Sequence, residues 1–367
     1  MARLLLLGAG HAHMTVMAHL PEIIARKHTV TTVGPLSRHY YSGMGPGMLG
    51  GAYTPEDISF PVEQMIESRG GEFIRDKAVR VDAAAKTVTL QSGLEVAYDV
   101  CSFNTGSSVP VSIVQQDAED VYTVKPIENL LAGRNRILEL AAKDTVRIGV
   151  VGGGPAALEV AGNAAACARE SGGKGASVRL YAGKRFLRGL TPRVRSLCLR
   201  QMHRHNVEIL EGSYASGIAT GKVTLEDGRT FAEDIIFVAM GVKPSALITA
   251  SGLPAGDDGG LAVNRFLQCD EHPDLFGGGD CIWFKERPLD KVGVYAVREN
   301  PVLYHNLLAR LEGGELQPFD PGGDYLLIFN TGGGTGVLHK SGVSFGGRLA
   351  FVIKDWIDRR FMREFQP

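Results

Sequence analysis

Two glycine-rich turns, each directly after an apolar run, constrain the fold of this chain more than any other feature. The second is the more specific, because the run Val146–Val151 leads into Gly152-Gly153-Gly154-Pro155-Ala156-Ala157, which has the form GxGxxA. The first glycine of this form permits a tight turn, the second lets the backbone approach a pyrophosphate, and the alanine lets a helix pack closely on the strand. The free N–H groups at the helix start hold the phosphate charge. We therefore expect a dinucleotide at Gly152 and Gly154.

The first glycine turn lies near the N-terminus. Arg3–Leu7 has four leucines in five residues and is predicted to be a buried strand, and Gly8 and Gly10 follow it. His13 stands where the usual fingerprint has its third glycine. Each turn opens its own β-α-β unit, which suggests two nucleotides that face each other. FAD and NAD(P)H are the simplest such pair, because a flavin takes hydride from a nicotinamide and passes electrons onward.

The first turn is not followed by the acid that usually binds the adenosine ribose. The strand predicted at 28–33 ends in Gly34-Pro35, and no Asp or Glu occurs from Ile23 to Thr54. We therefore expect Ser37, Arg38 or backbone groups to hold this ribose.

The second turn lacks the ribose acid as well. Its second strand, Val178–Gly183, lies in a stretch from 171 to 207 without Asp or Glu, and Lys184, Arg185 and Arg188 follow the strand. Such a cluster can pair with the 2′-phosphate of NADP, or it can form a solvated basic face. The sequence thus favours NADPH slightly over NADH.

Composition excludes several functions. A net charge of −1 argues against nucleic acid as a partner. No apolar run approaches the ~20 residues of a membrane span. The N-terminus enters a strand at once and shows no signal-peptide pattern, so we expect a cytoplasmic protein. The five cysteines are scattered without a CxxC pair, which excludes a close-spaced redox dithiol and gives no metal-ligand pattern.

Local patterns predict three further elements. A helix over Met14–Leu20 is expected to stop near Pro21, and another short helix is expected to begin with Thr54-Pro55-Glu56-Asp57. Between them, Tyr40–Tyr53 is dense in glycine. Such a segment lets the backbone pass against a flat ring, or it is simply a mobile loop.

Three more segments complete a resemblance, namely Asn104-Thr105-Gly106-Ser107, Ala239–Pro244 and Leu275–Asp280. With the two glycine turns, they make the chain resemble flavoproteins with two dinucleotide-binding domains. Within these it is most similar to the branch of type II NADH dehydrogenases and sulfide:quinone oxidoreductases, which lacks the close-spaced dithiol. The segments Gly10–His13, Tyr41–Met44 and Lys354–Met362 are similar to a sub-branch that includes FAD domains fused to selenide, water dikinases and cyanobacterial quinone reductases.

The resemblance implies an α/β fold with two Rossmann-like dinucleotide-binding domains, the second inserted in the first, and a short C-terminal module. Residues 1–112 and 245–325 would form the discontinuous FAD-binding domain, 113–244 the NAD(P)H-binding domain, and 326–367 the C-terminal module with an amphipathic helix. The chain would leave the FAD domain at a hinge marked by Lys125-Pro126.

The resemblance also implies which residues hold the cofactors. Those for FAD are Gly8, Gly10, His13, Arg38, Pro46, Val79, Thr105, Gly106, Gly279, Asp280, Lys291 and Gly293. Those for NAD(P)H are Gly152, Gly154, Glu159, Lys184, Arg185 and Gly241. Glu159 would lie near the nicotinamide. Lys291–Val294 would begin a helix whose dipole favours the anionic reduced flavin by ~1 kcal/mol. No metal is expected, and no catalytic side chain is named, because the flavin carries the chemistry.

The implied activity is electron transfer from NAD(P)H through flavin to a quinone or similar small acceptor. Two glutamines at the quinone site of type II NADH dehydrogenases are replaced here by Val294 and Arg298, and no cysteine follows Cys281, so sulfide is not the expected donor. The alternatives are an FAD oxidoreductase with a thiol, sulfur or selenium donor, and a flavin-binding sensor or partner protein that turns over poorly.

The end of the chain predicts a basic amphipathic helix. Apolar residues from Leu349 to Phe365 alternate with Lys354, Arg359, Arg360 and Arg363. Such a helix can lie on a membrane surface and admit a lipid-soluble quinone, it can pack on the FAD domain, or it can pair with a second copy of the chain. The protein would then be cytoplasmic, either free or peripheral on the inner face of the membrane.

Overall fold

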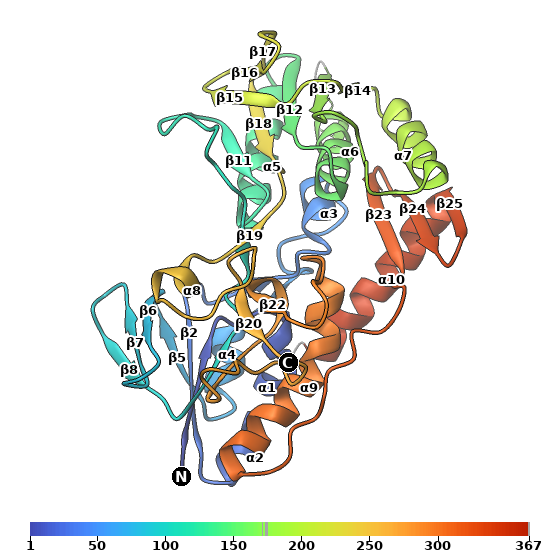
Figure 1. Cartoon of the computed structure of the whole chain (residues 1–367). Coiled ribbons are helices and arrows are strands. Elements are labelled where there is room, and N and C mark those ends of the chain that lie inside the picture. Colours follow the sequence, from blue (N-terminus) through green and yellow to red (C-terminus); the bar gives the residue numbers. More distant parts are fainter. Residues whose placement is uncertain (171, 173–174, 366–367) are drawn as a thin grey trace.

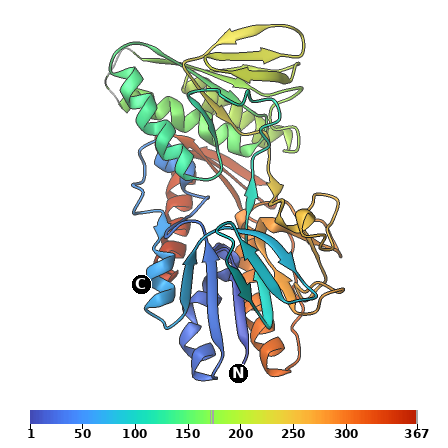
Figure 2. The same cartoon turned by 90° about the vertical axis from the view of Figure 1, so that its left-hand side faces the viewer.

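The computed structural model describes residues 1–170, 172 and 175–365. Two parallel sheets dominate these residues, one above the other in Figures 1 and 2. The predicted α/β class with two Rossmann-like units is confirmed.

The first sheet has the strand order β21-β9-β1-β2-β5, and all of its neighbours are parallel. Its central strand β1 is buried on both faces, because Leu4 to Leu7 are at most 1% exposed. The sheet combines strands from distant parts of the chain: β1 (Arg3–Leu7), β2 (Thr29–Gly34), β5 (Glu72–Arg75), β9 (Val100–Phe103) and β21 (Leu275–Gly277).

The second sheet has the order β11-β18-β12-β13-β14 and is also parallel. Its strands are β11 (Val121–Thr123), β12 (Val146–Val151), β13 (Ala176–Tyr181), β14 (Val207–Leu210) and β18 (Ile235–Val238). In both sheets the strand before the glycine turn has its sequence successor on one side and a later strand on the other. This reversal of strand order is where such sheets bind ligands, beyond the carboxyl ends of their strands.

Two connecting segments join the sheets. The short strands β10 (Ser107–Ser108) and β19 (Lys243–Pro244) pair antiparallel, so the chain passes in both directions through one place. The domain boundaries at 112/113 and 244/245 stay predictions.

Smaller elements surround the two sheets. The short strands are β3 (His39–Tyr40), β4 (Ser59–Phe60), β6 (Ala78–Asp82), β7 (Thr87–Leu90), β8 (Glu95–Ala97), β15 (Ala215–Ala219), β16 (Lys222–Leu225), β17 (Thr230–Ala232), β20 (Leu261–Val263) and β22 (Ile282–Phe284). The helices are η1 (His11–His13), α1 (Met14–Ala18), α2 (Leu20–Ala25), α3 (Gly45–Leu49), α4 (Val62–Glu67), α5 (Glu128–Ala141), α6 (Pro155–Glu170), α7 (Pro192–Arg204), α8 (Leu247–Ala250), η2 (Gly279–Cys281) and α9 (Gly293–Glu312).

The C-terminal part is an antiparallel sheet with a helix, formed by β23 (Leu327–Gly332), β24 (Thr335–Lys340), β25 (Val343–Gly347) and α10 (Arg348–Phe365). Strand β23 lies on α6, and α10 crosses this sheet and runs back toward the first unit (Figure 1). A Cβ atom on Gly162 of α6 would meet the Thr331 carbonyl oxygen at 2.1 Å, so the two backbones touch at a glycine.

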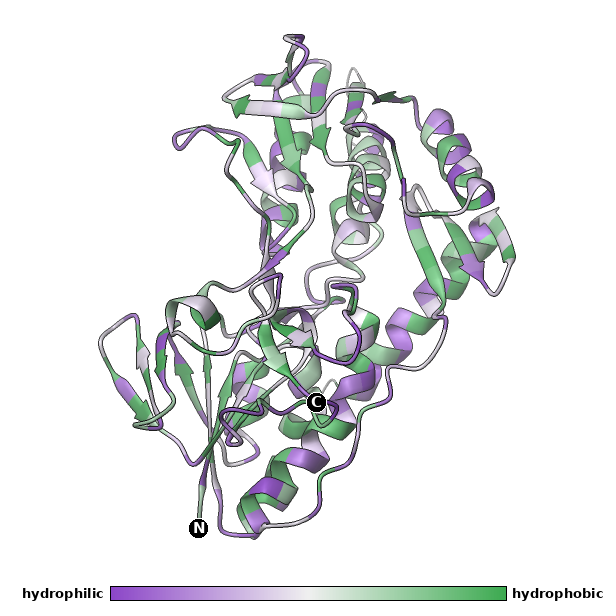
Figure 3. Cartoon of the chain, viewed as in Figure 1, coloured by the Kyte–Doolittle hydropathy of each residue, from purple (hydrophilic) through white to green (hydrophobic). Residues whose placement is uncertain are grey.

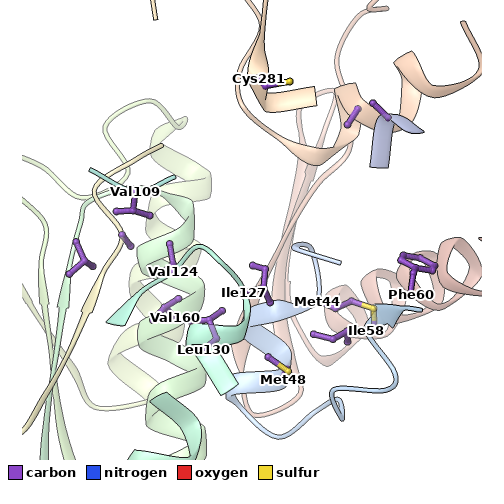
Figure 4. Close-up of a cluster of buried hydrophobic side chains, with 14 of the residues drawn as sticks. Met44, Met48, Ile58, Phe60, Val109, Val124, Ile127, Leu130, Val160 and Cys281 are labelled. Carbon is purple, nitrogen blue, oxygen red and sulfur yellow. The ribbon is translucent and has the colours of Figure 1, made fainter. Parts of the chain in front are cut away.

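A buried apolar cluster joins the two units. Figure 4 shows Met44 and Met48 of the α3 region next to Ile127 and Leu130, with Val160 of α6 close by. In Figure 3 the strands β12 and β18 carry the hydrophobic colour, as expected for strands covered on both faces.

Three predictions about elements need correction. Helix α1 ends at Ala18 and α2 begins at Leu20, so Pro21 lies in the first turn of a new helix and does not end one. This is possible because the first turn needs no N–H from proline. Residues 54–57 form a turn, in which the Thr54 N–H donates to Asp57 and the Asp57 N–H donates to Thr54 Oγ1. The glycine-dense segment contains the buried helix α3.

Among the helices of the described residues, none is long and apolar enough to cross a membrane.

Candidate functional site

One cavity of about 1590 Å³ reaches both glycine turns. Its walls come from the carboxyl ends of both sheets, the start of α9, strand β23 and the inner side of α10. The two turns that the sequence picked out independently therefore open into the same space.

The first glycine turn is packed against the end of β9. Gly8 has φ +88°, and a Cβ on Gly8 or Gly10 would meet Asn104 oxygens at 2.3 and 2.2 Å. The Asn104 side chain donates to the Gly278 carbonyl at 2.7 Å and so ties three segments together. Asn104 Oδ1 and Thr105 Oγ1 are buried without a hydrogen-bond partner among the described residues. Of these two atoms the Thr105 hydroxyl can donate a hydrogen bond, as the pyrophosphate end of a dinucleotide requires, whereas Asn104 Oδ1 can only accept one.

The second glycine turn has a different arrangement. A Cβ on Gly152, where φ is +149°, would meet the Ala239 carbonyl oxygen at 2.2 Å, so this position must be glycine. At Gly154 a Cβ would meet no described atom within 4 Å, which leaves the backbone beside the start of α6 open to the cavity. This is the shape that an approaching phosphate requires.

Asp280 anchors the wall between the two units. It accepts hydrogen bonds from Lys125 Nζ and Ser107 Oγ, both at 2.6 Å. Burial alone would raise the pKa of Asp280, but the charge of Lys125 and these hydrogen bonds hold it below its ordinary value. Lys291 forms an ion pair with Asp258 at 2.7 Å and also donates to the Ile282 carbonyl. A carboxylate that stays ionised here can accept from sugar or ribityl hydroxyls.

A chain of buried polar side chains lies where α10 faces the cavity. Lys354 Nζ donates to Asp358 at 2.8 Å, and Tyr41 Oη donates to the other oxygen of Asp358 at 3.1 Å. Asp358 raises the pKa of Lys354, although burial opposes it, so the ammonium stays charged. Glu159 of α6 lies near this pair and accepts from the Asn330 N–H at 2.7 Å. Burial raises the pKa of Glu159 to about 7.

Next to Tyr41 lies a pair of histidines. His39 Nε2 and His11 Nδ1 are 3.3 Å apart, and the two rings meet edge-on. The Tyr41 and Phe361 rings also pack against His11, with centroids 5.1 and 5.7 Å away.

The basic cluster lies at the end of β13. Lys184, Arg185 and Arg188 are exposed, line the cavity, and form no ion pair with the residues that the structure describes. Beside them the half-exposed ring of Tyr214 covers Gly183, at which a Cβ would meet that ring at 2.4 Å. An aromatic face next to free cations is suited to an adenosine phosphate.

Residues 2–306 match the sequence profile of the pyridine nucleotide-disulphide oxidoreductases. The chain belongs to this family. A curated relative, ferroptosis suppressor protein 1 of Taeniopygia guttata, is 28% identical over 306 residues, which cover 78% of this chain and 76% of the relative. The large subunit of the NADH-dependent nitrite reductase of Escherichia coli is 26% identical over 64% of this chain and 28% of its own length.

Two solved structures share the fold of this chain. The sulfide:quinone oxidoreductase of Aquifex aeolicus superposes with a TM-score of 0.80 at 18% identity, covering 100% of this chain and 92% of that one. NDH2 of Plasmodium falciparum in complex with NADH gives a TM-score of 0.78 at 14% identity, covering 98% and 99%. The chain therefore has the fold of two-domain flavoproteins, and the resemblance to these two branches is confirmed. FAD and NAD(P)H are typical cofactors of this family.

Although the family is named for a disulphide, this sequence has no CxxC pair. All five cysteines are free and buried. Cys281 packs beside the Gly278 and Phe103 carbonyl oxygens, and burial raises its pKa to about 11.

Most residues predicted from the sequence line the cavity. These are Gly8, Gly10, Arg38, Pro46, Thr105, Gly106, Gly154, Glu159, Lys184, Arg185, Gly241, Gly279, Asp280, Lys291 and Gly293. Gly152 belongs to the second turn but does not itself line the cavity. Val79 is 41% exposed and does not reach the wall, whereas the preceding residues Asp76, Lys77 and Ala78 do.

The His13 side chain packs behind the first glycine turn. It is fully buried, with Nδ1 2.7 Å from the Gly8 carbonyl oxygen and Nε2 2.8 Å from Ser102 Oγ. It therefore braces the glycine turn from behind and does not line the cavity.

Sequence reasoning missed the polar residues that α10 brings to the cavity. Lys354 and Asp358 lie in the buried stripe Ala350, Lys354, Asp358, Met362, in which every member is four residues from the next. A lysine and an aspartate on the buried face of an amphipathic helix were the available signal. In the sequence, His11, Tyr41 and Lys125 stand out only within motifs or at a hinge and His39 does not stand out, because only the fold brings these side chains to the cavity wall.

Proposed function

We propose that this flavoprotein oxidoreductase passes electrons from NADPH through FAD to a quinone. The observation that carries the proposal is the single cavity reached by both glycine turns. A cofactor on the first turn and a nicotinamide nucleotide on the second turn would meet there, and the wall formed by α10 and β23 would remain for an acceptor.

FAD would be held by the chain's own groups around the first turn. The backbone at Gly8, Gly10, Thr105 and Gly106 would face its pyrophosphate, and Asp280 would accept from its hydroxyls. Bound FAD would supply the two-electron chemistry between nicotinamide and acceptor. The start of α9 at Gly293 points its free N–H groups at the cavity and would favour negative charge on the ring.

The nicotinamide nucleotide would lie between the second turn and Glu159. Lys184, Arg185 and Arg188 would pair with a 2′-phosphate, since neither glycine unit supplies a ribose acid at the usual place. Tyr214 would stack on the adenine. These contacts support NADPH as the preferred donor.

The acceptor would lie against an apolar wall. Val294, Leu327, Phe329, Ile357 and Phe361 contribute to this side of the cavity. A flat apolar ring such as a quinone fits this lining. The positions at which type II NADH dehydrogenases carry glutamines are Val294 and Arg298, and the Arg298 guanidinium is engaged by the Pro321 and Gly323 carbonyls. The polar chain formed by Tyr41, Asp358, Lys354 and Glu159 would hold protons next to that ring.

The outer face of α10 would rest on a membrane surface. Leu349, Val352 and Trp356 follow one another at spacings of three and four residues and are 63%, 57% and 58% exposed. Arg348 and Arg360 flank them. An apolar stripe with basic neighbours favours the headgroup region of an anionic lipid surface.

Anaerobic stopped-flow spectroscopy tests the proposal. The FAD-loaded protein is mixed with NADPH or NADH, and the loss of yellow flavin absorbance is followed. We expect rapid bleaching, faster with NADPH, and reoxidation when a quinone is added. Bleaching by neither nucleotide would contradict the proposal and would favour a thiol-type donor or a protein without turnover.

A further inference from the structure

Residues 313–326 connect α9 to β23 and run back along α9 on the way to the C-terminal sheet (Figure 1). The first half of this connection is tied to the first unit. The buried Asn306 side chain accepts from the Gln317 N–H and donates to the Gln317 carbonyl, and Phe319 is buried. The second half, residues 320–326, is named the strap here. No backbone-to-backbone hydrogen bond joins the strap to another segment that the structure describes.

Two arginines hold the strap. Arg298 of α9 donates to the carbonyl oxygens of Pro321 and Gly323, the second at 3.4 Å. Arg287 donates to the carbonyl oxygen of Gly322, between them, at 3.1 Å. A guanidinium suits this task, because its five N–H donors lie in a rigid fork that reaches several acceptors at once. The position of the strap therefore depends on side chains from outside it.

The far end of the strap faces the cavity. Asp324, Tyr325 and Leu326 line the wall directly before the residues of β23 that form its apolar part. The Tyr325 ring meets the Tyr295 ring edge-on, with centroids 5.7 Å apart, and Tyr325 Oη donates to Asp290 at 3.5 Å. An aromatic ring that is held beside an apolar wall offers a stacking partner to a flat molecule.

We propose that the strap presents Tyr325 to the ring of the bound acceptor, and that Arg298 and Arg287 set the affinity for the acceptor by holding the strap in place. This inference rests on the proposed function and adds the residues that determine how tightly the acceptor binds. Both arginines are positioning residues, since they bind the backbone of the strap. Arg298 also lines the cavity, whereas Arg287 lies outside it and reaches the acceptor only through the strap.

A double-mutant cycle on Arg298 and Tyr325 tests the proposal. The variants are Arg298→Met, Tyr325→Leu and the double variant. Methionine keeps an apolar stem but donates no hydrogen bond, and leucine removes only the aromatic ring. The KM for menadione is measured on the FAD-loaded protein with NADPH as the donor. The control is Arg265→Met, at an exposed arginine outside the cavity that stacks on Phe266.

We expect each single variant to raise the KM for menadione about fivefold, the order for loss of one aromatic contact. The double variant should also show about fivefold, because both changes remove the same contact. The kcat, the anaerobic rate of flavin reduction by NADPH and all values of the control should be unchanged. A rise of about 25-fold in the double variant would mean that Arg298 contacts the acceptor itself, and an unchanged KM would mean that the strap does not bind it. Either result overturns the inference.

Limited proteolysis of the FAD-loaded protein gives a readout that does not depend on turnover. Chymotrypsin cleaves after aromatic residues, and mass spectrometry identifies a cut between Tyr325 and Leu326. We expect this cut to be at least about fivefold faster in Arg298→Met and in Arg287→Met, since a segment held by fewer bonds opens more often. An unchanged rate in both variants would overturn the role of the arginines.

Failure of the proposed function looks different from failure of this inference. Menadione would then not oxidise the reduced wild-type protein at all. The role of the strap in acceptor binding would fall with the proposed function, even where the arginine variants still speed the cut after Tyr325.

Discussion

The pKa values of two neighbouring acids beside the cavity, Asp280 and Glu299, are shifted in opposite directions. Asp280 is held ionised by Lys125 and Ser107. Glu299 of α9 is buried, accepts the Gly279 N–H at 2.5 Å and forms no ion pair with a residue that the structure describes. Burial raises the pKa of Glu299 to about 8. A difference in partners alone therefore sets one acid charged and the other neutral at pH 7.

Glu299→Gln should change how stability depends on pH. The folded chain keeps the Glu299 proton between its ordinary pKa of 4.5 and about 8, whereas the unfolded chain releases it, so the wild-type free energy of unfolding falls as pH rises through this window. Glutamine can still accept the Gly279 N–H but does not titrate. We expect similar melting temperatures near pH 5 and a more stable variant near pH 9, with about 1.4 kcal/mol gained per pH unit inside the window.

Calorimetry of both proteins across this range checks the prediction. Glu286→Gln, at an exposed glutamate, is the control. Parallel loss of stability in all three proteins would show that Glu299 is already ionised.

At the residue scale, the sequence predicted the positions of those site residues that belong to a local motif. Gly8, Gly10 and Gly154 could be predicted to line the site because their spacing from a strand fixes where they lie, and Asp280 is implied by the family resemblance. The role of Glu299 could not be predicted, since its pKa depends on burial by segments from elsewhere in the chain.

At the scale of elements, the contact between α6 and β23 depends on Gly162. In most helix interiors, replacing glycine with alanine stabilises a protein by about 1 kcal/mol. Here the new Cβ would meet Thr331 O at 2.1 Å, and a backbone oxygen cannot rotate away. We expect Gly162→Ala to lower the free energy of unfolding by about 1–3 kcal/mol, as overpacking does.

Urea unfolding measures this change. Gly293→Ala is the matched control, because a Cβ at that first residue of α9 would meet nothing within 4 Å of the described chain. Stabilisation by Gly162→Ala would mean that the C-terminal sheet does not press on α6.

The exposed stripe on α10 predicts lipid binding. We expect the double variant Val352→Ser, Trp356→Ser to bind vesicles of anionic phospholipid at least about tenfold more weakly in a sedimentation assay, since two apolar side chains no longer enter the headgroup region. Val111→Ser, which changes an exposed apolar residue elsewhere, should bind as the wild type does. Unchanged lipid binding together with loss of a dimer in ultracentrifugation would instead assign this face to a second copy.

Helices and strands could be predicted from the sequence where a local pattern of residues decides them. The strands before both glycine turns and the helix at the C-terminus are present as predicted. Pro21 misled because proline ends one helix and begins another equally well, and only the packing of Leu20 and Ile23 on the first sheet selects the second outcome. Helix α3 has a glycine-rich sequence with low helix propensity, and it is held by its buried contacts with α5 and α6.

At the scale of the whole molecule, one ligand would touch every part. The cavity is lined by both sheets, both connecting segments and the C-terminal part, so a dinucleotide in it would cross-link them. We expect saturating FAD to raise the melting temperature of the whole molecule in a single shared transition. At a free FAD concentration a hundredfold above Kd, the free energy of unfolding should increase by about 2.7 kcal/mol. Differential scanning calorimetry measures this, and a transition in which one part melts at its original temperature would contradict it.

All five cysteine side chains are buried in the folded protein, so thiol reagents do not reach them at its surface. Only a thiolate reacts with iodoacetamide, and burial raises the pKa of these thiols as well as hiding them. Alkylation therefore requires that the structure around a cysteine open, and its rate measures that opening. Cys167 and Cys198 lie on helices of the second unit, whereas Cys101 and Cys281 belong to the first. Mass spectrometry of partly alkylated protein would thus show which of the two units opens first.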